Sequence, residues 1–119
     1  MRAREINLLL FNSIPEIRDI YEKEVSWQDG HDTGSHVVYG NVLNRYIVER
    51  IMHGDVEAVR RVMAFVEMVL EKDDEDAENV IEVTVLEYFL DYNECNPMIK
   101  AELGPRAKIV WDRLVETYK

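Results

Sequence analysis

The length of 119 residues suits one domain, and a content of 47% hydrophobic and 32% charged residues excludes a disordered acidic tail and a membrane protein. The 24 acidic residues outnumber the 14 lysines and arginines, which gives a formal net charge of −10. This charge argues against binding to a nucleic-acid backbone and suits a basic protein partner.

Apolar residues recur at intervals of three and four, and glycine and proline fall between these periodic segments. The pattern predicts a single all-α domain over residues 1–119. A capping box between Ser13 and Glu16, around Pro15, is expected to begin the second helix. The expected elements of the first half are a helix over residues 3–12, a helix over about 15–25, a loop over 26–35 and a helix over 37–53. The residues expected on the buried side of the 37–53 helix are Tyr39, Leu43, Tyr46, Ile47 and Ile51.

Aspartates and prolines mark the expected helix starts of the second half. Asp55 is expected to cap one helix, and Asp73 or Asp74 the next. Proline in the first turn favours two more starts. The expected elements are helices ending near Lys72 and Tyr92, a short helix from Asn96-Pro97 and a last helix from Gly104-Pro105.

The helix that ends near Tyr92 has two apolar sides. At 100° per residue, one side holds Ala77, Ile81, Val85, Tyr88 and Tyr92, and the opposite side holds Val83, Leu86 and Leu90. A helix of this kind packs between two layers, so we expect it at the centre of the domain. Residues 81–85 also alternate and are rich in β-branched side chains, which leaves a strand there as the alternative.

The expected architecture is a compact bundle of six to seven helices. Two acidic turns, at Gly54-Asp55 and at Asp74-Glu75, each precede a buried helix and lie about twenty residues apart. This spacing is similar to the helical hairpins of HEAT or armadillo arrays. A plain bundle and stacked hairpins both explain it.

The acidic residues are concentrated in one part of the chain. Residues 55–94 carry thirteen acids and three bases, so the whole excess of −10 falls there, and it is densest over residues 71–78. Acids at a helix start are explained by capping and the helix dipole alone, and they can also meet a basic partner. The acids predicted to bind a partner are Asp73, Asp74, Glu75, Asp76, Glu78, Glu82, Glu87 and Asp91.

Aromatic residues supply a second set of candidates for partner binding. The tyrosines mostly fall on apolar helix sides and are expected in the core, whereas Trp27 stands in a polar loop without periodic partners. Tryptophan and arginine are frequent anchors in protein interfaces. We therefore expect Trp27 to be exposed, and we add Asp29 and Arg45 to the predicted binding residues.

The sequence contains no catalytic signature for a nucleophile, a phosphate-binding loop or a dinucleotide site, so we expect neither enzymatic activity nor a cofactor. Cys95 follows an acid, Glu94, which disfavours the thiolate. The alternative is a small metal-dependent enzyme, because four potential metal ligands lie close together in the sequence. They are Asp29, His31, Asp32 and His36.

The early apolar run over residues 8–11 is too short for a membrane span or a secretory signal. A single cysteine excludes an internal disulfide framework. We therefore expect a cytoplasmic protein that binds no membrane.

Short motifs spread over most of the chain carry a resemblance to a known family. They are residues 36–42 (HVVYGNV), Asn79-Val80-Ile81, Leu86-Glu87-Tyr88 and Leu103-Gly104-Pro105 before Trp111. The chain resembles a family of short, acidic, mostly helical bacterial proteins of unknown function, and some small proteins of this build are immunity proteins against polymorphic or contact-dependent toxins. The resemblance implies a cognate toxin domain as the basic partner, neutralised by occlusion. A generic adaptor or a self-associating regulator is the other non-enzymatic alternative.

Overall fold

A computed structural model describes residues 1–118, and these residues form helices and turns without any strand. The all-α prediction is confirmed, and the alternative strand over residues 81–85 is wrong because that segment is helical. The α-helices are α1 (Ala3–Ser13), α2 (Arg18–Val25), α3 (Ser35–Val38), α4 (Asn44–Met52), α5 (Val56–Leu70), α6 (Glu75–Asn79), α7 (Glu87–Leu90), α8 (Asn96–Ala101) and α9 (Pro105–Thr117). Short 3₁₀ turns at Pro15–Ile17 and Gly30–Asp32 complete the set. None of the described helices is long and apolar enough to cross a membrane.

Two of the helical rods contain a π-helical segment. The first π segment, Tyr39–Leu43, joins α3 to α4 without a break, and the second, Val80–Leu86, joins α6 to α7. We call the resulting rods helix 35–52 and helix 75–90. With each rod counted once, residues 1–118 form seven helices, which agrees with the predicted bundle of six to seven.

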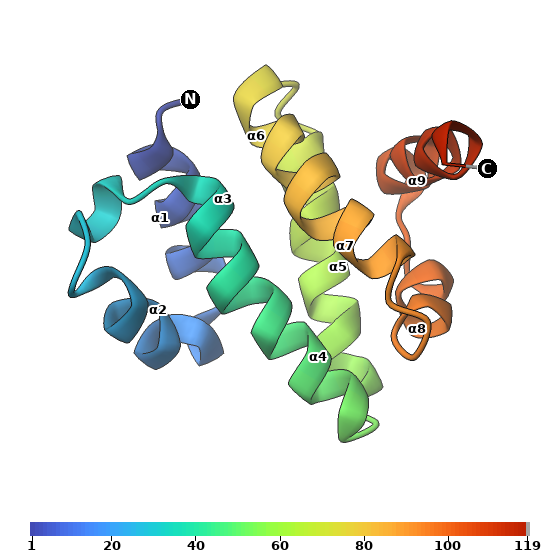
Figure 1. Ribbon diagram of the computed structural model, residues 1–119, viewed down its shortest axis with the longest axis horizontal. Coiled ribbons are helices and arrows are strands. Elements are labelled where there is room, and N and C mark those ends of the chain that lie inside the picture. The colour runs from blue at the N-terminus through green and yellow to red at the C-terminus, as the bar shows by residue number, and fades with distance from the viewer. Residues whose placement is uncertain (119) are drawn as a thin grey trace.

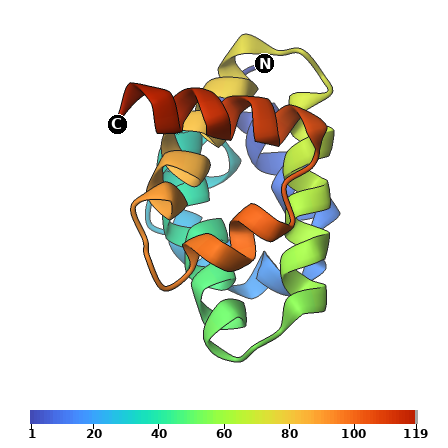
Figure 2. The same ribbon diagram turned by 90° about the vertical axis from the view of Figure 1, so that its right-hand side faces the viewer.

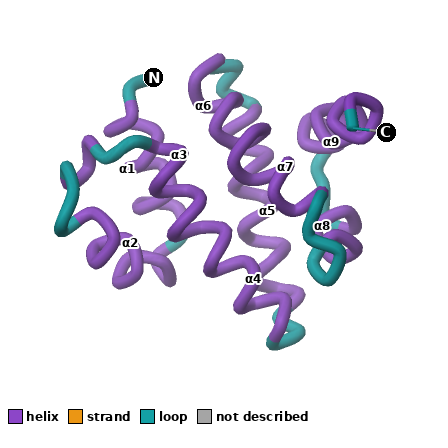
Figure 3. Tube along the Cα trace, in the orientation of Figure 1, coloured by secondary structure: helices purple, strands orange, loops and turns teal. Residues whose placement is uncertain are grey.

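Helix 35–52, α5 and helix 75–90 form the middle of the bundle and contact one another (Figure 1). On one side α1 and α2 cover helix 35–52, and on the other α8 and α9 cover α5 and helix 75–90. Figure 2 shows α9 lying across these two rods. Helix 75–90 is therefore central, as its two apolar sides predict, and the connections are short apart from the loop after α2 (Figure 3).

The buried face predicted for the third helix is confirmed. Tyr39 and Leu43 are fully buried, and Tyr46, Ile47 and Ile51 are exposed by 9% or less. The hydroxyl group of Tyr39 donates a hydrogen bond to the backbone oxygen of Ile6, which joins helix 35–52 to α1. Tyr39, Leu43, Ile47 and Ile51 are spaced by four residues, and a spacing of four stays on one face when a turn is widened by a π segment.

The buried face predicted for helix 75–90 is correct only in its first half. Ala77, Ile81 and Val85 are buried, but Tyr88 is 45% exposed, and the buried position is taken by Phe89. A π segment uses i→i+5 hydrogen bonds and adds a residue to the turn, so the 100° period overestimates the rotation there. The wider turn moves the apolar face one residue along the sequence.

The opposite side of helix 75–90 is also less apolar than expected. Leu86 is fully buried and Leu90 is half-buried, but Val83 is 47% exposed. The same wide turn that moves Tyr88 out of the core separates Val83 from the face that carries Leu86. The prediction of a second apolar side is therefore right for two of its three residues.

The loop over residues 26–34 is fixed to α1 by one buried polar side chain. The Nδ2 group of Asn7 donates to the backbone oxygens of His31 and Thr33, at 2.9 and 2.6 Å. Its Oδ1 atom accepts from the hydroxyl group of Ser35 at 2.8 Å. Asn7, which makes all three contacts, is fully buried, so the loop has a defined shape.

The predicted caps are partly confirmed. Asp55 accepts from the backbone N–H of Ala58, and Asp74 accepts from that of Ala77, as an N-cap residue does. The capping box between Ser13 and Glu16 is wrong, because α1 extends through Ser13 and the following 3₁₀ turn has no side-chain cap. Pro15 alone marks that start.

The start of α9 is capped by a residue from another helix. Gly104 precedes α9 and has no side chain to satisfy the first backbone N–H groups. Glu67, on α5, accepts from the backbone N–H groups of Arg106 and Ala107 at 2.9 and 3.0 Å. A Cβ atom on Gly104 would clash with the Glu67 side chain, which explains the glycine.

We predict that Gly104→Ala destabilises the fold by displacing the Glu67 carboxylate. The expected loss of unfolding free energy is about 1–2 kcal/mol, the cost of an N-cap. In a Glu67→Ala background, Gly104→Ala is expected to be neutral or slightly stabilising, since the backbone of Gly104 is extended and the clash is gone. Urea denaturation of the four proteins measures this, and equal losses in both backgrounds would refute the contact.

We also predict opposite sensitivities at two adjacent aromatic residues. Phe89→Ala removes a fully buried ring and is expected to lower the unfolding free energy by about 3–5 kcal/mol. Tyr88→Ala removes a half-exposed ring and is expected to cost less than about 1 kcal/mol. The same denaturation experiment compares them, and a larger loss at Tyr88 would show that the helix keeps its ordinary period through Val80–Leu86.

Candidate functional site

The two π segments face each other at the closest approach of helix 35–52 and helix 75–90. A Cβ atom built on Gly40 would lie 3.5 Å from Cγ2 of Thr84, so the absence of a side chain at Gly40 allows this spacing. One turn further, the Nδ2 group of Asn44 donates a hydrogen bond of 2.9 Å to the backbone oxygen of Thr84. Nδ1 of His36 adds a hydrogen bond to the Thr84 hydroxyl group. The π segments, which often occur at functional sites, are thus joined by side chains.

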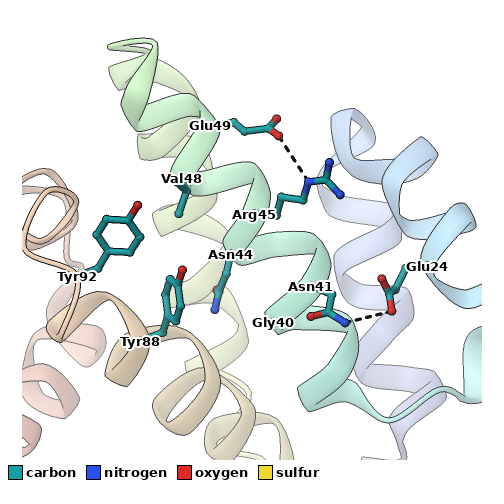
Figure 4. Close-up of a pocket in the computed structure, with 9 residues that line it drawn as sticks. All are labelled: Glu24, Gly40, Asn41, Asn44, Arg45, Val48, Glu49, Tyr88 and Tyr92. Atoms are coloured by element: carbon teal, nitrogen blue, oxygen red, sulfur yellow. Dashed lines mark hydrogen bonds and ion pairs between the residues drawn. The ribbon is translucent and has the colours of Figure 1, made fainter.

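An open groove lies directly beside this contact. It has a volume of about 530 Å³ and runs between α2, helix 35–52 and the end of helix 75–90 (Figure 4). Tyr88 and Tyr92 form one wall, with ring centroids 5.8 Å apart and planes inclined at 61°. The remaining lining residues are Glu24, Gly40, Asn41, Asn44, Arg45, Val48 and Glu49.

Polar contacts hold the lining side chains. The Glu24 carboxylate accepts from Nδ2 of Asn41 at 3.1 Å and from Nε2 of Gln28 at 2.7 Å. Arg45 forms an ion pair with Glu49, with 3.6 Å between Nε and Oε1 (Figure 4). Both partners of this pair are substantially exposed, so it contributes little to stability and leaves Arg45 able to move.

The groove continues to the predicted anchor Trp27. A second hollow, which shares Glu24 and Arg45 with the first, is lined by Trp27, Ile20 and Lys23. The side chain of Trp27 is 74% exposed. Two predicted binding residues, Trp27 and Arg45, therefore lie on one continuous surface. We call this surface, from Trp27 to Tyr92, the aromatic groove.

The predicted acids lie elsewhere, mainly in the acidic turn over residues 71–78. Asp73 pairs with Arg106 at 2.6 Å, and Asp74 pairs with the Met1 ammonium group at 2.6 Å. Asp76 lies 3.6 Å from the same ammonium group. Much of the charge that appears concentrated in the sequence is therefore balanced by bases from either end of the chain.

Helix 75–90 carries the remaining predicted acids. Arg113, on α9, contacts Glu82 at 2.7 Å and Glu78 at 4.0 Å. Glu87 accepts a hydrogen bond of 2.8 Å from the hydroxyl group of Tyr118. Asp91 is exposed at the end of the rod, and Glu75 makes no ion pair within residues 1–118. Glu78, Glu82 and Glu87 therefore contact residues of α9 or the residue after it, and they also add to the negative charge of the surface.

Hydrogen bonds keep Asp74 ionised. The hydrogen bond from the Met1 ammonium group, and then that from the backbone N–H of Ala77, lower the pKa of the Asp74 carboxyl. Hydrogen bonds and charge from Asp73 raise the pKa of Arg106, and Glu82 does the same for Arg113. These groups keep their charges at neutral pH, which is the behaviour of structural ion pairs.

The four potential metal ligands of the loop do not come together. His31 shares a hydrogen bond of 2.9 Å with the Tyr21 hydroxyl group, and Asp32 pairs with Arg4. His36 is directed to Thr84, and Asp29 is exposed on the loop. Within residues 1–118 no group of three or more His, Cys, Asp or Glu side chains is arranged to hold a metal. The geometry gives no support to the metal-dependent alternative.

Cys95 is fully buried in the turn after helix 75–90, directly before α8. Burial, and then the charge of Glu94, raises the pKa of its thiol. A buried thiol with a raised pKa is a poor nucleophile.

Sequence reasoning missed the polar residues that line the aromatic groove. Glu24, Asn41 and Glu49 resemble ordinary surface residues of a helix, and nothing in the sequence shows that α2 faces helix 35–52. Asn44 is the exception, because an asparagine between the apolar Leu43 and Tyr46 on a buried face is a detectable signal. A period of 3.6 residues per turn places Tyr88 and Tyr92 on the buried face of the rod, whereas Tyr88 is 45% exposed.

Comparison with known proteins identifies a family without a known activity. The model of a domain of unknown function (DUF7674) matches residues 6–119. No curated protein and no solved structure matches the chain. Hence the predicted likeness to HEAT arrays and to immunity proteins stays a prediction, whereas membership of an uncharacterised family is confirmed. The chain belongs to the DUF7674 family of domains of unknown function.

Proposed function

We propose that this chain is a non-enzymatic protein-binding domain that docks a basic protein partner in the aromatic groove. The observation that carries the proposal is the placement of three accessible aromatic side chains and one exposed arginine along one hollow surface. Trp27 is 74% exposed and Tyr88 is 45% exposed, so both rings keep apolar area that a partner could bury. Exposed apolar side chains that gather on one surface mark an interaction site.

The composition of the groove supports a protein rather than a small molecule as its occupant. Tryptophan, tyrosine and arginine are the residues that most often carry binding energy in protein interfaces. The groove is wide open and polar at its rim, with Glu24, Asn41 and Glu49 beside the aromatic rings. A small-molecule site would be expected to enclose its ligand more fully.

The charge of the molecule supports a basic partner. The formal net charge is −10, and the acidic turn lies roughly 20 Å from Tyr88 along helix 75–90. Several of these acids are paired with Arg106, Arg113 and the Met1 ammonium group, which leaves fewer carboxylates free to contact a partner. The net negative charge that remains attracts a basic partner over a distance. The aromatic groove then supplies the short-range contacts.

The specific form of the proposal is that the partner is a cognate toxin domain, which this chain neutralises by covering its basic active surface. Small size, acidity and the absence of catalytic motifs support this role, together with the family resemblance of the sequence. An adaptor or a self-associating regulator would use the same groove without such a partner.

We predict that a toxin domain is encoded beside this chain and that binding to it depends on salt and on Trp27. Raising the ionic strength from about 50 to 500 mM is expected to slow association at least about tenfold, because the long-range attraction is screened. Trp27→Ala is expected to speed dissociation about thirtyfold, as loss of an interface anchor does. Surface plasmon resonance with a catalytically inactive toxin domain measures both rates, and the same variant should lose protection of cells that express the active toxin.

Ile109→Ala is the matched control, since Ile109 is 66% exposed but lies on α9 outside the aromatic groove. It should leave both rates unchanged. Absence of binding by the unaltered chain would overturn the toxin proposal. Binding with an association rate independent of salt would overturn the role given to the acidic turn.

A further inference from the structure

The aromatic groove has a buried hydrogen-bond acceptor without a partner among residues 1–118. Asn44 is 3% exposed, and its Oδ1 atom makes no hydrogen bond within this part of the chain. The orientation of the amide is set by its Nδ2 group, which donates to the backbone oxygen of Thr84. Flipping the amide would place two oxygens together, so Oδ1 must be the unpartnered atom. An unsatisfied buried acceptor is unfavourable, and a ligand that donates a hydrogen bond to it would remove that penalty.

Tyr88 is positioned to uncover this acceptor. It lies one turn beyond Thr84 on helix 75–90, and its ring stands beside Asn44 on the groove wall (Figure 4). Since Tyr88 is 45% exposed, its ring can rotate towards solvent without opening the core. The space vacated by the ring would lie between Asn44 and Tyr92.

The charged residues around this space favour the binding of one cationic group. Glu24 and Glu49 contribute two negative charges to the lining and Arg45 contributes one positive charge, so the groove has a net charge of −1. Arg45 is held only by its exposed pair with Glu49. A second cation therefore enters a site that is still negative.

We propose that the aromatic groove binds an arginine side chain of the basic partner. The guanidinium group would donate to Oδ1 of Asn44 and lie against the rings of Tyr88 and Tyr92, in a groove whose lining keeps a net charge of −1. A guanidinium group suits this set better than an ammonium group, because it is planar and can stack on a ring while donating from its edge. This inference rests on the proposed function and names the partner side chain that enters the groove.

The test uses N-acetyl-arginine methylamide as a probe, and N-acetyl-citrulline methylamide as its neutral analogue of the same shape. We expect the arginine probe to shift the NMR signals of the Asn44 side-chain amide and of residues 40–49 and 84–92. The citrulline probe at the same concentration should give shifts at least about fivefold smaller. Equal shifts for the two probes, or arginine shifts confined to the acidic turn over residues 71–78, would overturn the inference.

Variants connect the binding to the groove. Tyr88→Ala is expected to weaken binding of the arginine probe about fivefold. Tyr118→Ala, which removes an exposed tyrosine just after α9, should leave it unchanged. An unchanged affinity in Tyr88→Ala would overturn the inference even if the chain binds its partner. Failure of the partner to bind while the arginine probe still binds at Asn44 would overturn the proposed function and leave the arginine site standing.

Discussion

The contact between helix 35–52 and helix 75–90 at Thr84 determines both the packing of the bundle and the shape of its surface. Gly40 allows the rods to approach, and Asn44 joins them through the backbone oxygen of Thr84. Each rod has a π segment at this point, and the wider turn brings Phe89 into the core and leaves Tyr88 outside. One local departure from α-helical geometry therefore creates a tyrosine wall and places a buried amide beside it.

Electrostatic interactions divide the surface of the molecule into two regions with different tasks. The acidic turn over residues 71–78 is held by Arg106 and by the Met1 ammonium group, while Arg113 holds the neighbouring helix 75–90. These pairs anchor α9 and the start of helix 75–90, and they leave a long-range negative field. The aromatic groove lies at the other end of helix 75–90 and has few fixed ion pairs. The proposed function therefore places attraction and short-range contact on separate surfaces of the same rod.

The helices and most of the core could be predicted from the sequence because they depend on the local spacing of apolar residues. The exposure of Trp27 could be predicted because this residue lies in a polar loop outside any such spacing. The buried faces of helix 35–52 and α5 follow regular spacing, apart from the exposed Val56 at the start of α5. The phase error at Tyr88 arose because a π segment has no residue signature and is set by tertiary packing. The cap of α9 by Glu67 and the meeting of Glu24 with Asn41 join residues distant in sequence, so neither could be predicted from spacing.

The central claim is that the aromatic groove, rather than the acidic turn, is the surface that contacts the partner. Hydrogen–deuterium exchange of the chain, alone and in complex with the inactive toxin domain, tests it most directly. We expect new protection over residues 23–28, 40–49 and 84–92, with residues 71–78 little changed. New protection over residues 71–78 without any in the groove would contradict it.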